Sequence, residues 1–89
     1  MLSASVKIIN RLGLHARAAA KFMQMATSFR CEVFVEKGTK KINGKSIMGL
    51  MMLAASQDCE LVISTEGEDE EAALQALIAL IDSRFGEPE

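Results

Sequence analysis

The pattern of hydrophobic and polar positions divides the chain into seven short segments. Four of them, residues 6–9, 31–36, 40–43 and 60–65, are rich in β-branched or partly alternating apolar residues, as strands are. Three others carry apolar residues at helical spacing: 16–28, 47–54 and a last segment that starts near residue 68. The predicted order of elements is therefore βαββαβα.

Turn-forming and capping residues lie between these segments. Asn10 to Gly13 ends the first strand, and Lys37-Gly38-Thr39 joins the second and third strands as a hairpin turn would. Ser46 is the expected N-cap of the second helix. Acidic residues 68–71 complement the positive N-terminus of the third helix.

No predicted strand is apolar on both faces over its whole length, which favours an antiparallel sheet with helices on one side. The predicted fold class is α+β: an open-faced β-sandwich, a four-stranded antiparallel sheet covered on one face by three helices. At 89 residues the chain is expected to form one domain, residues 1–89. The last helix is expected to bury Leu74, Leu77, Ile78, Ile81 and Phe85, and the second helix Leu50 and Leu53.

Composition narrows the class of protein further. Hydrophobic residues make up 49% and charged residues 25% of the chain, which is typical of a soluble globular protein. With no leader pattern and no apolar run near the ~20 residues that span a bilayer, a cytoplasmic protein without membrane association is expected. Cys31 and Cys59 with one histidine make a poor metal set, so both are expected to be small buried hydrophobes, and neither a metal nor a cofactor is expected.

Charge is distributed unevenly along the chain. The net charge of −2 and pI of about 5.4 argue against nucleic-acid binding, for which a basic surface supplies most of the affinity. Residues 1–45 hold nine of the ten Lys and Arg against two acids, a sum of +7, whereas residues 46–89 hold one Arg against ten acids, a sum of −9. The basic half contains the histidine, so an acidic partner surface is expected there.

The only histidine, His15, lies where the first strand gives way to the first helix, in the stretch Gly13-Leu14-His15-Ala16-Arg17. The backbone N–H groups at the start of a helix have no partner within the helix and favour an anion. The N–H groups of Ala16 and Arg17 are thus expected to stabilise a phosphate carried by His15, with the Arg17 guanidinium assisting.

The residues that would complete a hydrolytic site are missing. There is no second histidine, no tyrosine and no Ser/Asp pattern that suggests a triad. A protein that carries a phosphoryl group from one protein to another needs only a reactive exposed group and a docking surface. This favours a carrier over a stand-alone enzyme.

GLHAR with the small-residue helix after it, and GKSIMGLMML some thirty residues later, resemble the histidine-containing phosphocarrier (HPr/NPr) family of the bacterial phosphoenolpyruvate-dependent phosphotransferase system. The resemblance covers essentially the whole chain. It implies that His15 takes a phosphoryl group on Nδ1 from enzyme I and passes it to enzyme IIA components for sugar uptake, through a phosphohistidine intermediate. The partner-binding surface would include Lys21, Lys45, Ile47, Met48 and Met51.

The same resemblance gives Ser46 a regulatory role. It implies phosphorylation of Ser46 by an HPr kinase/phosphorylase, which would add nearly two negative charges at a helix N-terminus beside the docking surface. The family commonly has proline after the arginine of GLHAR, whereas this chain has Ala18. Alanine restores a backbone donor in the first turn, so a modest change in transfer rate is expected.

Two other functions are compatible with the sequence. A nitrogen-branch regulatory carrier would use the same histidine, and the C-terminal run EEAALQALIALIDSRF fits that branch, although the GKS segment favours the sugar branch. A noncatalytic binding module would use Ser46 and its helix and leave His15 inert. The chain is expected to be a monomer, because no long amphipathic seam is left once three helices cover the sheet.

Overall fold

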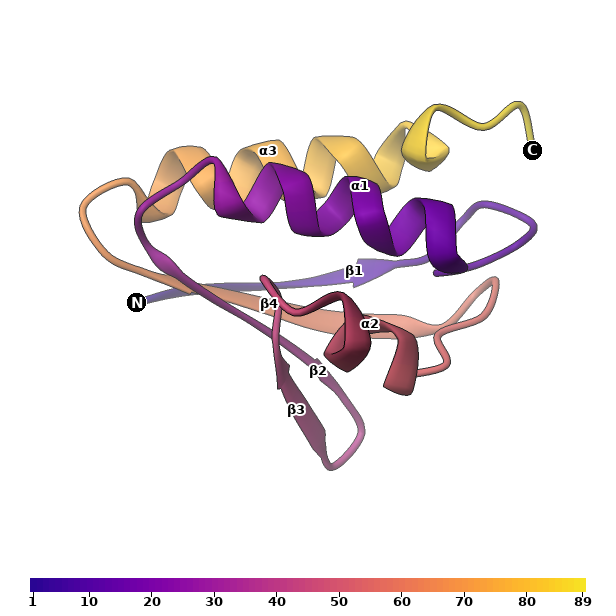
Figure 1. Ribbon diagram of the computed structural model, residues 1–89, viewed down its shortest axis with the longest axis horizontal. Coiled ribbons are helices and arrows are strands. Elements are labelled where there is room, and N and C mark those ends of the chain that lie inside the picture. Colours follow the sequence, from indigo (N-terminus) through magenta and orange to yellow (C-terminus); the bar gives the residue numbers. More distant parts are fainter.

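The computed structural model describes all residues from 1 to 89 and confirms the predicted order of elements. The elements are β1 (Leu2–Lys7), α1 (Ala16–Thr27), β2 (Glu32–Lys37), β3 (Lys40–Asn43), α2 (Ile47–Met52), β4 (Glu60–Glu66), α3 (Glu70–Asp82) and η1 (Arg84–Gly86), a single turn whose residues have positive φ angles. The four strands form one antiparallel sheet in the order β1-β4-β2-β3. The predicted open-faced α+β sandwich is confirmed (Figure 1).

The helices lie side by side over one face of this sheet. In Figure 1, α1 and α3 run above the strands, and the short helix α2 lies below the N-terminal half of α1. The helix α3 packs on β1 and β4, whereas α2 contacts β3 and α1. The N-terminus of α1 and the C-terminus of the chain therefore lie at the same end of the molecule (Figure 1), and α2 packs beside α1.

Most boundaries lie within two residues of the prediction, and the bounds of β1 and α2 need an explanation. The strand β1 begins at Leu2, not at Val6. Its first residues pair with β4, but their side chains are mostly exposed, so they show no hydrophobic pattern in the sequence. The helix α2 ends at Met52, with Leu53 as its C-cap, because Ala54 adopts a left-handed conformation (φ 51°) that a helix cannot continue through.

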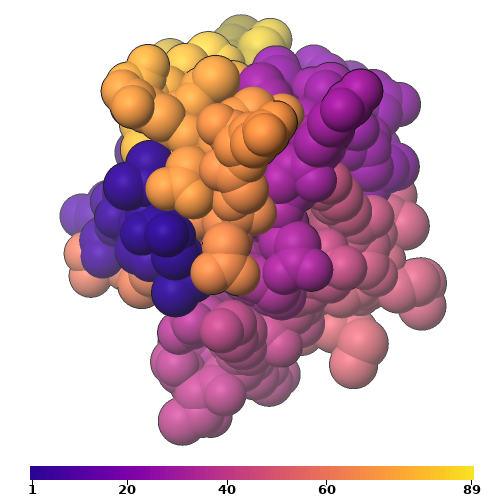
Figure 2. Space-filling model, turned by 90° about the vertical axis from the view of Figure 1, so that its left-hand side faces the viewer, coloured from indigo at the N-terminus to yellow at the C-terminus, as the bar shows by residue number.

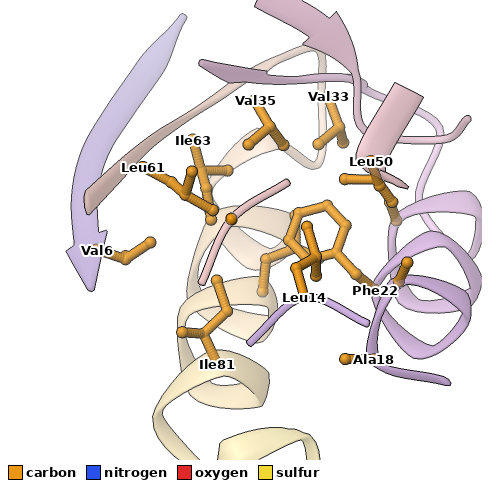
Figure 3. Packing of buried hydrophobic residues seen from close by; sticks show 14 of the residues in the cluster. Val6, Leu14, Ala18, Phe22, Val33, Val35, Leu50, Leu61, Ile63 and Ile81 are labelled. Atoms are coloured by element: carbon orange, nitrogen blue, oxygen red, sulfur yellow. The ribbon is translucent and has the colours of Figure 1, made fainter. Parts of the chain in front are cut away.

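The core lies between the sheet and the three helices. Figure 3 shows the ring of Phe22, from α1, pointing into the middle of this cluster towards the valines of β2. The predicted burial of Leu50, Leu53, Leu74, Leu77, Ile81 and Phe85 is confirmed. Ile78 and Cys59 are only partly buried, contrary to prediction, because each lies at the edge of the cluster rather than under a neighbouring element.

At the end of the molecule away from His15, the N-terminal residues lie against the start of α3 (Figure 2). The N-terminal ammonium group is 3.6 Å from Glu70 Oε1. Nearby, the Asp69 carboxylate accepts hydrogen bonds from the backbone N–H groups of Arg30 (2.8 Å) and Cys31 (2.9 Å). Asp69 thus joins the α1–β2 loop to the start of α3. None of the helices is long and apolar enough to cross a membrane.

We predict that Asp69 makes folding stability depend on pH. The hydrogen bond from the Arg30 N–H and that from the Cys31 N–H hold the pKa of Asp69 below its usual value, against the effect of burial. Its stabilisation is therefore complete above the unfolded-state pKa of about 3.9 and is lost as pH falls through the lower folded-state pKa. Urea denaturation at several pH values should show Asp69→Ala less stable than wild type at pH 7, with a smaller loss of stability between pH 5 and pH 3.

The matched control is Glu71→Gln, which neutralises an exposed acid of the same helix turn that makes no hydrogen bond. Its stability profile should follow that of the wild type. Parallel profiles for Asp69→Ala and wild type down to pH 3 would contradict the assignment.

Candidate functional site at the start of helix α1

The loop between β1 and α1 is held in one sharp turn. Gly13 has φ +66°, and a Cβ there would lie 2.6 Å from the Ala55 carbonyl oxygen, so only glycine fits. The Leu14 N–H donates to the same Ala55 carbonyl oxygen at 2.8 Å. The fully buried Asn10 donates from Nδ2 to the Gly13 carbonyl oxygen at 2.8 Å. These contacts decide where the next residue, His15, begins the helix.

His15 is the N-cap residue of α1, with extended backbone angles (φ −75°, ψ 178°), as its place in the sequence predicted. Its imidazole does not cap the helix. The backbone N–H groups of Ala16, Arg17 and Ala18 therefore make no hydrogen bond within the chain. Free donors and the positive end of the helix dipole meet beside the imidazole, which suits a bound dianion.

The C-terminal tail forms the other side of the site. One carboxylate oxygen of Glu87, Oε2, contacts His15 Nε2, and the other, Oε1, accepts a hydrogen bond from Asn10 Nδ2 at 2.8 Å. Farther along, Arg11 pairs with Glu89 at 3.1 Å, and its backbone N–H donates to the Glu89 carbonyl oxygen at 3.0 Å. The tail is thus attached to the β1–α1 loop on both sides of Pro88.

The Glu87 carboxylate is ionised more readily than an ordinary glutamate. Partial burial opposes ionisation, but the hydrogen bonds from Asn10 and His15, with the positive charge of Lys21 nearby, hold the pKa of Glu87 below its usual value. Its side chain is 12% exposed, compared with 27% for His15. Glu87 therefore covers Nε2, and the imidazole as a whole stays partly exposed to solvent.

An open hollow of about 620 Å³ lies beside the imidazole. Its walls come from the β1–α1 loop, the first turn of α1 and the tail, and include Arg11, His15, Arg17 and Glu87. Arg17 is exposed and makes no ion pair, so its guanidinium is free to meet an anion in this hollow. No three His, Cys, Asp or Glu side chains lie together in a way that could hold a metal ion.

The short helix α2 presents the apolar surface expected from the sequence. Ile47, Met48 and Met51 are 37%, 70% and 41% exposed, and Leu50 and Leu53 face the core. This division between outward and inward residues is confirmed, and Met52, 68% exposed, extends the surface beyond the predicted residues. The N-cap role of Ser46 is confirmed as well, since its Oγ accepts a hydrogen bond from the Gly49 N–H at 3.1 Å.

The two lysines expected on the partner-binding surface already have partners within the chain. Lys45 Nζ donates to the Phe29 carbonyl oxygen at 2.8 Å, and Lys21 Nζ donates to the Phe85 carbonyl oxygen at 2.6 Å. Lys45 thereby links α2 to the end of α1, and Lys21 links α1 to the turn before the C-terminal tail. Their charges face the surface, but their donors also support the fold.

The sequence did not predict Glu87, Glu89 or Arg11 as residues of the site. Asn10 was taken only as a turn former. The Glu87–His15 and Glu87–Asn10 contacts join residues 72 and 77 positions apart in the chain. No local spacing can indicate such contacts. A clue in the sequence is the tail Glu87-Pro88-Glu89 itself, an acidic end to a chain whose histidine lies in its basic half.

Comparison with known proteins agrees with this geometry. Residues 2–83 match the family model described as "PTS HPr component phosphorylation site". The chain is 54% identical to the phosphocarrier protein HPr of Neisseria meningitidis serogroup A over the full length of both chains. It superimposes on the crystal structure of HPr-C-His from Thermoanaerobacter tengcongensis with a TM-score of 0.97, 49% identity and full coverage of both chains.

A further crystal structure, of an HPr dimer from the same organism, matches with a TM-score of 0.79 and 50% identity and covers 98% of this chain and 100% of that one. The open-faced sandwich, with one histidine at the N-terminus of a helix, places this protein in the class of histidine phosphocarriers. The chain belongs to the HPr family of phosphocarrier proteins of the phosphotransferase system.

We predict that Gly13→Ala destabilises the protein far more than the same change at Gly38. Both glycines are left-handed, but a Cβ at Gly38 meets nothing within 4 Å. Gly38→Ala should therefore lower the free energy of unfolding by only about 1 kcal/mol, the cost of a left-handed backbone for alanine. Gly13→Ala should lower it by about 3 kcal/mol, because the new methyl group also displaces the Ala55 carbonyl. Equilibrium unfolding in urea measures both. Equal losses would show that the close approach of Gly13 to Ala55 is unimportant.

Proposed function

We propose that this protein accepts a phosphoryl group on His15 from phosphorylated enzyme I and passes it to enzyme IIA components that serve sugar uptake. The observation that carries the proposal is the position of His15, partly exposed, beside three unpaired N–H groups at the start of α1. The general phosphocarrier role follows from membership of the family. The donor, the acceptors and the sugar branch are the proposed steps.

The site is suited to both states of a carrier. Before transfer, an imidazole at the rim of an open hollow can be reached by a phosphoryl donor on another protein. After transfer, the N–H groups of Ala16 and Arg17, joined by that of Ala18, can donate to the phosphate oxygens, and Arg17 can add a charge-assisted hydrogen bond. The chain has no group placed to hydrolyse the product, so the partners complete the chemistry.

The exposed side chains of Ile47, Met48 and Met51 are the proposed docking surface for enzyme I and enzyme IIA. Methionine side chains adapt to partners of different shape, which suits a surface that must bind several proteins in turn. Positive charge is concentrated in the first half of the chain, which favours acidic partner surfaces. A monomer in the cytoplasm is the proposed working form, because docking requires this end of the molecule to be free.

We further propose that phosphorylation of Ser46 by an HPr kinase/phosphorylase regulates docking. Ser46 Oγ accepts the N-cap hydrogen bond of α2, and a phosphate oxygen can accept the same bond, so the modified helix should stay folded. The added charge would lie at the edge of the docking surface. Acidic partners would then be repelled without any change of fold.

The sugar branch is preferred to the nitrogen branch on two grounds. The Gly44-Lys45-Ser46 segment is present, and relatives that are 54% and 48% identical are named phosphocarrier protein HPr.

We predict that incubation with enzyme I, magnesium and phosphoenolpyruvate adds one acid-labile phosphate to the wild type and none to His15→Ala. Intact mass before and after acid treatment measures the modification, and a known HPr serves as positive control for enzyme I. No phosphate on the wild type, while the control protein is labelled, would count against the carrier proposal and favour a binding module.

We predict that Ser46→Asp keeps the helix cap but slows phosphoryl transfer from enzyme I roughly tenfold, whereas Ser46→Ala loses about 1 kcal/mol of stability and transfers at the normal rate. Ser5→Asp is the matched control, because it adds the same charge at an exposed position of β1, away from α2. Initial rates and thermal denaturation separate the two effects. Equal slowing by Ser5→Asp would show that net charge alone is responsible.

A further inference from the structure

We propose that Glu87 is a positioning residue for phosphoryl transfer. Its carboxylate accepts a hydrogen bond from His15 Nε2–H, so that the lone pair of the neutral imidazole lies on Nδ1. The same carboxylate offsets the positive charge that the ring gains in transfer. This inference rests on the proposed function and goes beyond it, since it places the C-terminal tail in the transfer site. The inference depends on three features: how the tail is held, how the Glu87 carboxylate is oriented and which ring nitrogen of His15 the carboxylate contacts.

The tail is fixed before and after Glu87. Arg84, Phe85 and Gly86 all have left-handed backbone angles, a costly turn that is offset by complete burial of the Phe85 ring. The Phe85 carbonyl oxygen accepts from Lys21 Nζ at 2.6 Å, and the Glu87 N–H donates to the Arg84 carbonyl oxygen at 2.9 Å. Beyond Pro88, the Glu89 contacts with Arg11 close the loop. Glu87 is therefore presented to His15 by a backbone that is attached at both ends.

The carboxylate itself is oriented by Asn10. Its Nδ2 group donates both to Glu87 Oε1 and to the Gly13 carbonyl oxygen, each at 2.8 Å. Asn10 is fully buried, so a carboxamide that cannot rotate freely fixes the Glu87 oxygens relative to the loop that carries His15. This arrangement of carboxamide, carboxylate and imidazole is an oriented chain of hydrogen bonds, and the imidazole is its exposed end.

The contact between Glu87 and Nε2 of His15 determines the state of the other ring nitrogen, Nδ1. A carboxylate can only accept, so Nε2 must carry the proton, and in the neutral ring Nδ1 then holds the lone pair. In transfer, the Nδ1 lone pair forms the bond to phosphorus, and the bond from phosphorus to the enzyme I group breaks, its electron pair returning to that group. The proton stays on Nε2 throughout, and the ring becomes cationic.

A carboxylate beside that proton stabilises the cationic ring more than the neutral one. It therefore favours both the transition state and the phosphorylated product over the starting state. Removal of the charge should slow phosphoryl acceptance and shift the phosphoryl equilibrium back towards enzyme I. If the tail only covered the histidine, its alteration would instead speed phosphoryl acceptance.

The first test observes the Nε2 proton directly and needs no partner protein. In wild-type protein labelled with ¹⁵N histidine, the Nε2–H signal should be visible by NMR, because the hydrogen bond to Glu87 slows its exchange with water. Glu87→Ala should lose this signal, and Glu71→Gln, which removes the charge of an exposed acid in the first turn of α3, should retain it. Persistence of the signal in Glu87→Ala would overturn the assignment.

The second test measures transfer with Glu87→Gln, which preserves the shape of the side chain but not its charge. The rate of phosphoryl acceptance and the equilibrium constant for phosphoryl transfer from enzyme I should each fall by on the order of tenfold, the lower end of the loss seen when the carboxylate partner of a metal-bound histidine is removed. Glu71→Gln, with the same loss of charge at an exposed position of α3, should stay within about twofold of wild type in both measurements. Thermal denaturation of each variant checks that the fold is retained.

An unchanged or faster transfer in folded Glu87→Gln would overturn the proposal, the faster rate indicating that the tail shields His15. A wild type that accepts no phosphate would overturn the proposed function and the transfer part of this inference together. The proton signal distinguishes the two failures, because it reports on the Glu87–His15 contact whether or not transfer occurs.

Discussion

The buried carboxamide of Asn10 joins segments that are far apart in the chain. It holds the β1–α1 loop through Gly13 and the C-terminal tail through Glu87. Because Asn10 is inaccessible to water, loss of either bond would leave a buried donor unsatisfied, at a cost of about 1–3 kcal/mol. The position of His15 relative to both the helix and the tail depends on this one side chain.

The remainder of the fold makes that small site rigid. A sheet of four paired strands and a core centred on Phe22 fix α1 in place, and α1 fixes the N–H groups that face the imidazole. The helix α2, whose outward methionines are exposed, packs beside α1 (Figure 1). A rigid surface suits a phosphocarrier that other proteins recognise, because little rearrangement is then needed on binding.

The prediction from sequence succeeded where a signal is local. Helical spacing and capping residues placed α1, α2 and α3, and Ser46 was assigned as an N-cap from its position alone. The prediction failed at β1, whose first residues are exposed and held by pairing with β4, and at Ala54, whose left-handed conformation no propensity indicates. Ile78 was expected in the core because it lies on the apolar stripe of α3, but a stripe does not show how far a neighbouring element extends over it.

By itself the sequence determined the order of elements, the open-faced sandwich, the family and the place of His15 at a helix N-terminus, because each follows from residues close together in the chain. Only the tertiary structure decided what surrounds the imidazole. The Glu87 carboxylate reaches His15 across 72 positions, through a buried turn at Phe85 and a carboxamide from the opposite end of the chain. Such contacts arise from packing and backbone closure, for which a single sequence carries no local pattern.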